Sequence, residues 1–211
     1  MKRWVSLAVV VLSFVLLPFF LFGESVEQGI SEVLLQRRGP GLAFFLVAAL
    51  VVDVALPVPS SLIASYACQQ FGPLLGLLII MAGASGALAA AYGIGRGLGT
   101  AGTERTLGQA DYARAVDFGE RRGAALAVAL SRALPVLAEA IGLLAGALRW
   151  PFLTTMLWGT SASFGMAVAY AVFFAWVGSE ASGWHVLLGA TVVPGVALLL
   201  ATFVLNKRGS G

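Results

Sequence analysis

The chain has 211 residues, of which 59% are hydrophobic and 11% are charged, and its formal net charge is +3. Soluble domains carry about 25% charged residues, so this chain has too little polar surface to coat a soluble core. With one cysteine, Cys68, and one histidine, His185, it cannot form an intrachain disulfide or a cysteine and histidine metal site. The composition predicts a membrane protein without metal or cofactor. Its basic residues are better explained as flanks of membrane helices than as a nucleic-acid surface.

The first apolar run, near residues 4–23, follows Lys2 and Arg3. It is longer than the apolar core of a signal peptide, which has about 7–15 residues, and no small-residue cleavage site follows it. We therefore expect a retained membrane helix rather than a cleaved leader. Residues 24–38 are polar and amphipathic, so residues 1–38 are expected to form a membrane helix and then a segment at the membrane surface.

Residues 39–178 are predicted to form the core of the protein. The core would contain a first unit at 39–98, a polar loop at 99–122 and a second unit at 123–178. Residues 179–211 follow as a membrane helix and a basic tail. Loops rich in lysine and arginine lie in the cytoplasm, so we expect the polar loop and both termini there, which requires an even number of crossings.

Simple spans are expected at residues 74–97, 152–178 and 185–206, because each is apolar and close to the ~20 residues that cross a bilayer. Together with the first helix they make about four spanning helices.

Two further apolar stretches contain proline at their middle. Residues 39–72 contain Pro57 and Pro59, and residues 123–149 contain Pro135. Proline removes a backbone hydrogen bond and ends or kinks a helix. The second stretch is too short for two spans, which need about 40 residues, so we expect a re-entrant hairpin that enters and leaves on the cytoplasmic side. The first stretch allows two interpretations, two short spans or a hairpin entering from outside.

The two stretches are related by an internal repeat. The tetrapeptide "ALPV" at residues 55–58 recurs at residues 133–136, a shift of 78 positions. The same shift places Pro73 on Pro151, Ser85 on Ser163 and Tyr92 on Tyr170. Many secondary transporters are built from inverted repeats. We therefore predict an all-α membrane protein with about four spanning helices and two oppositely oriented re-entrant hairpins that form an inverted repeat.

Three ionisable residues are expected near the middle of the membrane: Asp53, Arg132 and Glu139. A charge at mid-helix costs about 2.5–3.5 kcal/mol on insertion scales, and broken helices persist only where they are buried or line a wet cavity. We therefore expect the two breaks to face a common polar cavity. There Arg132 would attract an anionic group, Asp53 and Glu139 would bind protons, and Ser60 and Ser61 would bond carbonyls freed by the first break. In the structural alternative, Arg132 and Glu139 form an ion pair and Asp53 caps a half-helix.

The segment "YGIGRGLG" ends a predicted membrane helix rather than following a strand, so its glycines favour close helix packing over nucleotide binding. Arg96 within it is either an interfacial anchor or a contact for a lipid phosphate. His185 is predicted at the wrong depth to activate Ser60 or Ser61, so the sequence does not predict an enzyme.

Three segments together resemble the DedA family, which carries the VTT or "SNARE-associated" domain. They are "ALPVPSSLIASYACQQFGPLLG", "GASGALAAAYGIGRGLG" and "SRALPVLAEAIGLLAGALRWPFLTTMLWGT". The resemblance covers roughly residues 40–178. It implies two re-entrant hairpins and a role in lipid flipping or scrambling, often coupled to protons. Of the family's charged positions, Arg132 carries over directly. Ser60 and Ser61 stand where the family often has an acid, and Ala138 where it often has a second arginine.

We therefore hypothesise that the protein is a multi-pass lipid transporter of the bacterial inner membrane. Its partners would be membrane lipids and protons, and the sequence does not decide whether it forms a homo-oligomer. The transported lipid would have an anionic headgroup, either that of an anionic phospholipid or that of a polyprenyl phosphate. The alternatives are a proton-coupled transporter of a small solute and a non-transporting membrane scaffold. A lipid path needs a groove open sideways to the bilayer, whereas a solute path needs a closed one.

Overall fold

The computed structural model describes residues 39–56, 58, 60–98, 103–105, 108–120, 122–132, 135–178 and 183–209. The helix and surface segment expected within residues 1–38 lie outside the described residues, as do Pro57 and Pro59. Every regular element in the described ranges is a helix, which confirms the predicted all-α class for this part of the chain.

The first element, α2 (Pro40–Val52), begins with proline directly after Gly39. Proline suits this position because the first N–H groups of a helix have no partner within it. The 13 residues of α2 span about 20 Å at 1.5 Å per residue, which is less than the ~30 Å hydrocarbon core of a bilayer.

The next element, α3 (Ser60–Leu98), consists of two helices joined at Gly72. Gly72 has φ 76° and ψ 169°, a conformation that only glycine adopts readily, and Pro73 starts the second part. A Cβ placed on Gly76 would lie 2.6 Å from the Cα of Cys68, so residues 73–98 fold back along residues 60–71.

The second half of the core repeats this order of elements. A short helix, α6 (Arg122–Ser131), is followed by a break and by a second short helix, α7 (Pro135–Ala147), and then by the long α8 (Phe152–Val177). Pro135 is the first residue of α7, so the break lies just before it. The 26 residues of α8 span about 39 Å, enough to cross a bilayer. The final helix is α9 (Gly183–Gly209).

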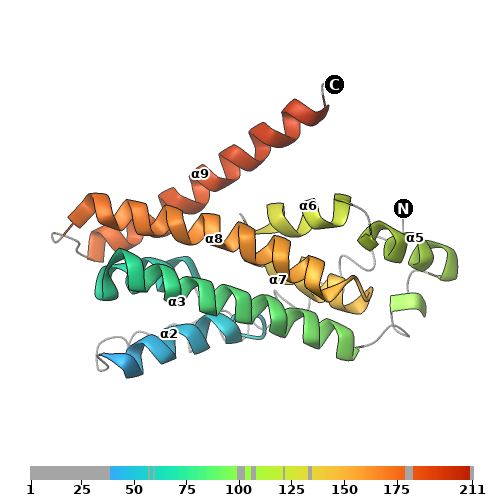
Figure 1. The fold of residues 1–211 in the computed structure, drawn as a ribbon, viewed down its shortest axis with the longest axis horizontal. Coiled ribbons are helices and arrows are strands. Elements are labelled where there is room, and N and C mark those ends of the chain that lie inside the picture. The colour runs from blue at the N-terminus through green and yellow to red at the C-terminus, as the bar shows by residue number, and fades with distance from the viewer. Residues whose placement is uncertain are drawn as a thin grey trace.

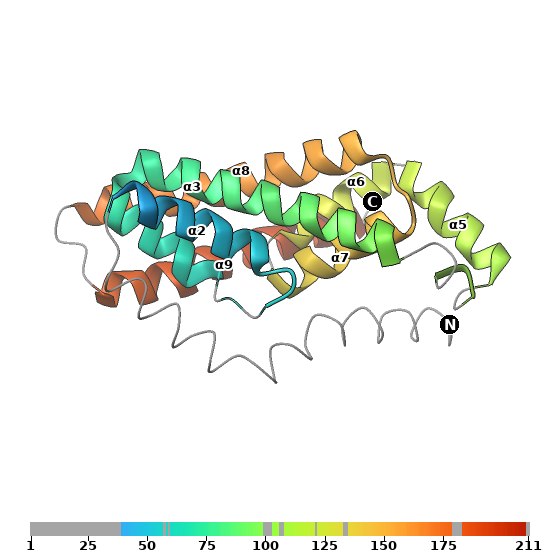
Figure 2. The same ribbon diagram turned by 90° about the horizontal axis from the view of Figure 1, so that it is seen from below.

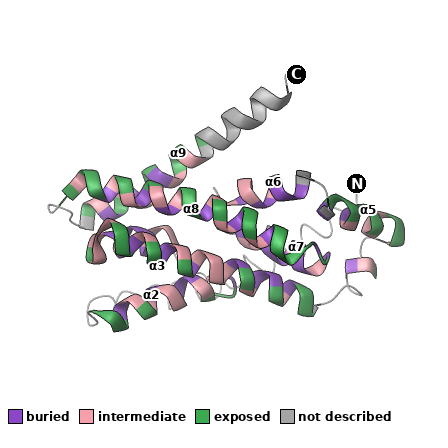
Figure 3. Ribbon diagram, viewed as in Figure 1, coloured by how far each residue is buried: buried purple, intermediate pink, exposed green. Residues whose placement is uncertain are grey.

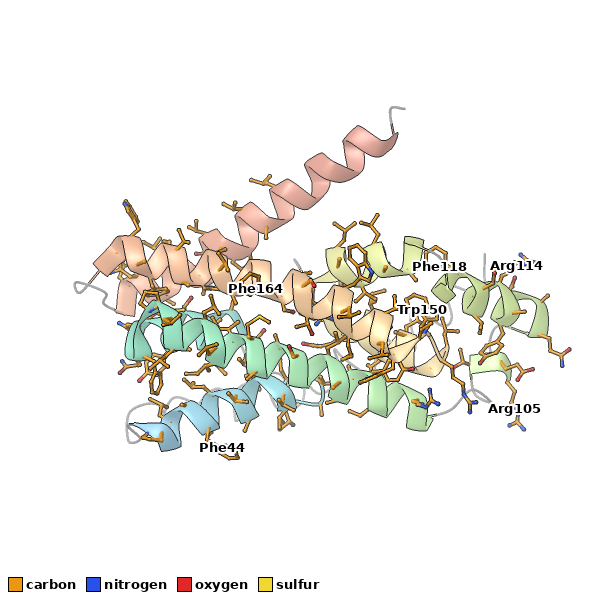
Figure 4. The ribbon with its side chains drawn as sticks, in the orientation of Figure 1. Phe44, Arg105, Arg114, Phe118, Trp150 and Phe164 are labelled. Atoms are coloured by element: carbon orange, nitrogen blue, oxygen red, sulfur yellow. The ribbon has the colours of Figure 1, made fainter. Side chains whose placement is uncertain are left out.

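The polar segment at 99–122, expected as a loop, contains a further helix, α5 (Gln109–Glu120). The helix forms because one of its faces has a packing partner: Ala115 is buried, and its carbonyl oxygen accepts a 3.0 Å hydrogen bond from Nε1 of Trp150. Phe118 of the same helix lies against Trp150, with ring centroids 5.9 Å apart (Figure 4).

The two units enter the molecule from opposite ends. In Figure 1, α2 starts at the left and α6 at the right, and both reach the middle of the molecule. The long helices α3 and α8 pack against each other, and α9 packs on both (Figures 1 and 2). The two breaks therefore meet near the centre, where Asp53 and Arg132 line the same cavity.

Exposed residues recur along the outer sides of the long helices (Figure 3). Large apolar side chains are among them: Phe44 is 77% exposed, Leu153 73% and Trp176 83%. Among the described residues, two helical segments are long and apolar enough to cross a membrane: Ser60–Gly97 and Phe152–Val177. The part of the first segment that follows Gly72 is by itself long enough to do so. Exposed apolar surface on this scale is typical of a protein that faces lipid.

The helices α3 and α7 pack at the closest distance that backbones allow. A Cβ on Gly95 would overlap the carbonyl oxygen of Leu143, and a Cβ on Gly146 would overlap that of Tyr92. The hydrophobic effect does not drive membrane helices together, because lipid tails are as apolar as the helices. Small residues let the backbones approach closely, and the resulting van der Waals contacts stabilise the packing.

Candidate functional site

A cavity of about 120 Å³ lies where the two breaks meet. Its lining contains all five residues that were expected at the polar cavity: Asp53, Ser60, Ser61, Arg132 and Glu139. They come from four places in the chain: the ends of α2 and α6 and the beginnings of α3 and α7. Each is half-buried. The breaks thus bring charges that are far apart in sequence into one small space.

Asp53 holds the first break in shape. Its Oδ1 accepts a 3.1 Å hydrogen bond from the backbone N–H of Val58, and the side chain of Ser60 also bonds to its carboxyl group. The N–H groups of Ala55 and Leu56 bond the carbonyl of Val52, which ends α2 in a tight turn. Asp53 therefore bonds the backbone within the first break, and the proposal that it caps a half-helix stays a prediction.

Arg132 directs its guanidinium across the second break. Its Nη2 donates a hydrogen bond to the carbonyl oxygen of Ala138, in the first turns of α7. Its Nε is buried and has no partner in the described part of the protein. The charge of Glu139 acts on Arg132, but the hydrogen bond of the guanidinium goes to the carbonyl of Ala138, the residue before Glu139. A buried donor left unsatisfied costs about 1–3 kcal/mol, and more when it is charged, so this nitrogen is poised for an acceptor.

Glu139 and Asp53 line the same cavity, and their carboxyl groups lie close enough to interact. An ionised carboxylate only accepts, so a hydrogen bond between two such groups requires one proton. With one proton between them, the pair would carry one negative charge, which the positive charge of Arg132 would balance. This arrangement can gain or lose a proton and can accept an anion on the arginine side.

The cavity has further walls that sequence reasoning missed. Ser163 and Tyr170 of α8 are buried beside it, and Pro194 of α9 also lines it. The repeat contained a signal for two of them, because a shift of 78 positions relates Ser163 to Ser85 and Tyr170 to Tyr92. Within the described residues, no group of three histidine, cysteine or acidic side chains could hold a metal ion.

Arg96 lies apart from this cavity. It is exposed near the end of α3, and its Nη1 donates to the hydroxyl of Tyr92 at 3.3 Å. That hydroxyl donates in turn to the carbonyl oxygen of Trp150 at 2.7 Å, which ties α3 to the turn before α8. The structure places Arg96 outside the central cavity, and its roles as an interfacial anchor or as a contact for a lipid phosphate stay predictions.

A larger apolar cavity of about 780 Å³ adjoins the first, and Arg132 and Met166 line both. The charged site thus opens onto a hydrocarbon-like surface.

Comparison with known families identifies the chain. The model of the VTT domain matches residues 58–176, more than half of the sequence. The chain belongs to the VTT-domain family, the DedA family. Neither the curated proteins nor the solved structures gave a match. The matched range holds Ser60 and Ser61, Arg132 and Glu139 together with all of α7, while Asp53 lies just before it. Membership makes this a membrane protein of a family generally linked to membrane transport.

Proposed function

We propose that this VTT-domain protein moves lipids with an anionic headgroup, an anionic phospholipid or a polyprenyl phosphate, across the bacterial inner membrane. The observation that carries the proposal is the buried Nε of Arg132, which lacks a partner in the described part of the chain and belongs to a side chain that lines one cavity with Asp53 and Glu139. Arginine binds phosphate well because its planar fork matches the spacing of phosphate oxygens.

Proton coupling follows from the charges in the central cavity. The site is neutral with one proton on the Asp53–Glu139 pair and the positive charge of Arg132. A phosphate that binds Arg132 adds negative charge, and excess charge is costly in a space with little water. A second proton on the carboxyl pair restores neutrality. Binding of the anion and of a proton therefore support each other, and the lipid and proton move together.

The apolar cavity beside Arg132 favours a lipid over a small solute. A water-soluble substrate would gain nothing from an apolar surface next to its charged group, whereas a lipid has one apolar and one charged part. A scaffold without transport activity would need neither an arginine nitrogen that lacks a partner among the described residues nor two acids beside it.

The proposed membrane arrangement follows from helix lengths. Each arm of the two broken segments, such as α2 with 13 residues, is too short to cross a bilayer alone, so each pair forms a re-entrant hairpin. The second part of α3, together with α8, α9 and the helix expected at 4–23, makes four spans, with both termini in the cytoplasm. The opposed entry of α2 and α6 then gives the inverted repeat.

Replacement of Arg132 tests the proposal. In proteoliposomes containing a headgroup-labelled anionic lipid, Arg132→Gln should reduce flipping by about a hundredfold, which corresponds to the loss of roughly 3 kcal/mol from one charged hydrogen-bonding group. Arg132→Lys should retain part of the activity, because lysine keeps the charge but lacks the planar fork.

The matched control is Arg114→Gln, which removes an exposed arginine of α5 outside the cavity and should flip lipid at close to the wild-type rate. Full activity of Arg132→Gln, or equal losses in the two glutamine variants, would contradict the proposal.

A further inference from the structure

We infer that the surface between α6, α8 and α9 is the groove that holds the hydrocarbon tail of the lipid whose headgroup binds at Arg132. The inference rests on the proposed function, because it needs an anionic headgroup at Arg132, and it adds where the rest of the molecule lies.

The groove has the shape and chemistry of a tail site. Its volume is about 780 Å³, within the range of about 300–1,000 Å³ typical of small-molecule sites. One wall is a face of α8 built from residues spaced three and four apart: Ala162, Gly165, Ala169, Val172 and Trp176. α6 and α9 supply the other walls with side chains such as Leu130 and Val196. Arg132 is the sole charged residue among the described lining residues.

The groove is long enough for the tail of a lipid. From Ala162 to Trp176 it follows α8 for about 21 Å, at 1.5 Å per residue. One leaflet contributes about half of the ~30 Å hydrocarbon core, or roughly 15 Å. Several lining side chains are uncovered, with Val172 62%, Trp176 83% and Val196 50% exposed. The surface therefore meets the bilayer along a length that an acyl or isoprenyl chain can occupy.

Arg132 connects the groove to the charged site. It lines both cavities, and its Nε is buried and unpartnered within the described ranges. Bulk lipid tails are as apolar as the groove, so apolar contact alone would not favour one lipid over another. The arginine supplies the selection: a lipid with an anionic headgroup is held at its head while its tail stays in the groove.

Gly165 and Gly195 provide a matched pair of variants. A Cβ added to either would meet nothing within 4 Å, so neither position resists a side chain. Gly165 lines the groove, whereas Gly195 of α9 is not among the described lining residues. Leucine is a better helix former than glycine, so both changes should support their helices to a similar degree. Gly165→Leu fills the groove and Gly195→Leu does not.

The test uses phosphatidic acid that carries a diazirine at the end of one acyl chain. The full-length protein is reconstituted in phosphatidylcholine vesicles containing this probe and irradiated, and labelled peptides are mapped by mass spectrometry. Labelling should concentrate on residues 162–176 and 192–197, and unlabelled phosphatidic acid should compete for it. Gly165→Leu and Arg132→Gln should each lower this labelling by about tenfold, which equals ~1.4 kcal/mol of lost binding, whereas Gly195→Leu should leave it unchanged.

Three results would overturn the inference: label spread evenly over all apolar faces, label confined to residues 1–38, or groove labelling that Arg132→Gln leaves intact. The last would mean that the tail and headgroup sites are independent. If flipping requires Arg132 but is unaffected by Gly165→Leu, the tail site in the groove is rejected and the proposed transport function stands. Groove labelling in a protein that flips no lipid would support the tail site while rejecting the transport proposal.

Discussion

Asp53 has two kinds of partner that place different demands on it. The N–H of Val58 needs only an oxygen acceptor, whereas the carboxyl of Glu139 requires a proton between the two acids. In Asp53→Asn, the side-chain oxygen could still accept the hydrogen bond from Val58, but the side chain could no longer bind a proton. The structural and the proton-binding interpretations of this residue can therefore be separated by one substitution.

The acids predict a pH dependence with a definite sign. If anion binding takes up a proton, wild-type transport falls as pH rises, by up to about tenfold per pH unit in the limit of one proton. Glu139→Gln leaves Asp53 to bind that proton, so the dependence persists with a changed midpoint. The double variant Asp53→Asn with Glu139→Gln leaves Arg132 without any acid, and its transport should not change with pH.

Flipping rates at acidic, neutral and alkaline pH, measured with protein whose helix content by circular dichroism matches the wild type, provide the comparison. Tyr170 also lines the cavity and remains in every variant. A double variant that keeps the full wild-type pH dependence would show that the coupled proton binds elsewhere.

Sequence alone could identify the charged residues of the site but not their bonds. Asp53, Arg132 and Glu139 stand out because charges are rare in apolar runs, and all three line one cavity. The bond from Arg132 to the carbonyl of Ala138 could not be predicted, because it depends on how the chain turns between Ser131 and Pro135.

At the scale of helices, the contact between α3 and α7 fixes the second hairpin beside the site. The sequence indicated that glycines near the end of α3 permit close packing, but it could not say which of them do so. Gly95 lies against the backbone of α7, whereas a Cβ placed on Gly93 would meet nothing within 4 Å. The difference arises because residues two apart on a helix face different directions.

Gly95→Ala should therefore destabilise the protein, and Gly93→Ala should not. The added methyl group at residue 95 overlaps the carbonyl oxygen of Leu143, and overpacking of this kind costs about 1–3 kcal/mol. At residue 93 the same change only improves helix propensity. Thermal unfolding in detergent, followed by circular dichroism, should give a lower Tm for Gly95→Ala alone. Equal Tm values would show that α7 can move away from α3 at little cost.

The sequence did not predict α5, and the reason is again a distant contact. Its partner Trp150 is far away in the chain, and a short polar segment gives no sign of the apolar face that such a partner would bury.

For the whole molecule, the repeat predicted the order of elements in both units, because the same short helix, break, short helix and long helix recur. It could not predict that α9 contributes Pro194 to the lining of the central cavity, since α9 lies outside the repeat.

The orientation in the membrane gives a further prediction. In a Cys68→Ala background, Ala113→Cys on α5 should react with a membrane-impermeant thiol reagent only from the cytoplasmic side. Trp184→Cys, at the start of α9 and at the other end of the molecule (Figure 1), should react only from outside. Both positions are exposed in the structure, so failure to label would not reflect burial. Reaction of both cysteines from the same side would contradict the opposed hairpins.

The central claim, that the charges at the two breaks serve transport rather than folding, is tested most directly by the double variant Arg132→Met with Glu139→Leu. Replacing buried charges by apolar side chains of similar volume is often neutral or stabilising, so the variant should fold and insert normally. We predict that it nevertheless flips headgroup-labelled anionic lipid in proteoliposomes no faster than protein-free vesicles do. Wild-type flipping by this variant would contradict the account and reduce the charges to a structural role.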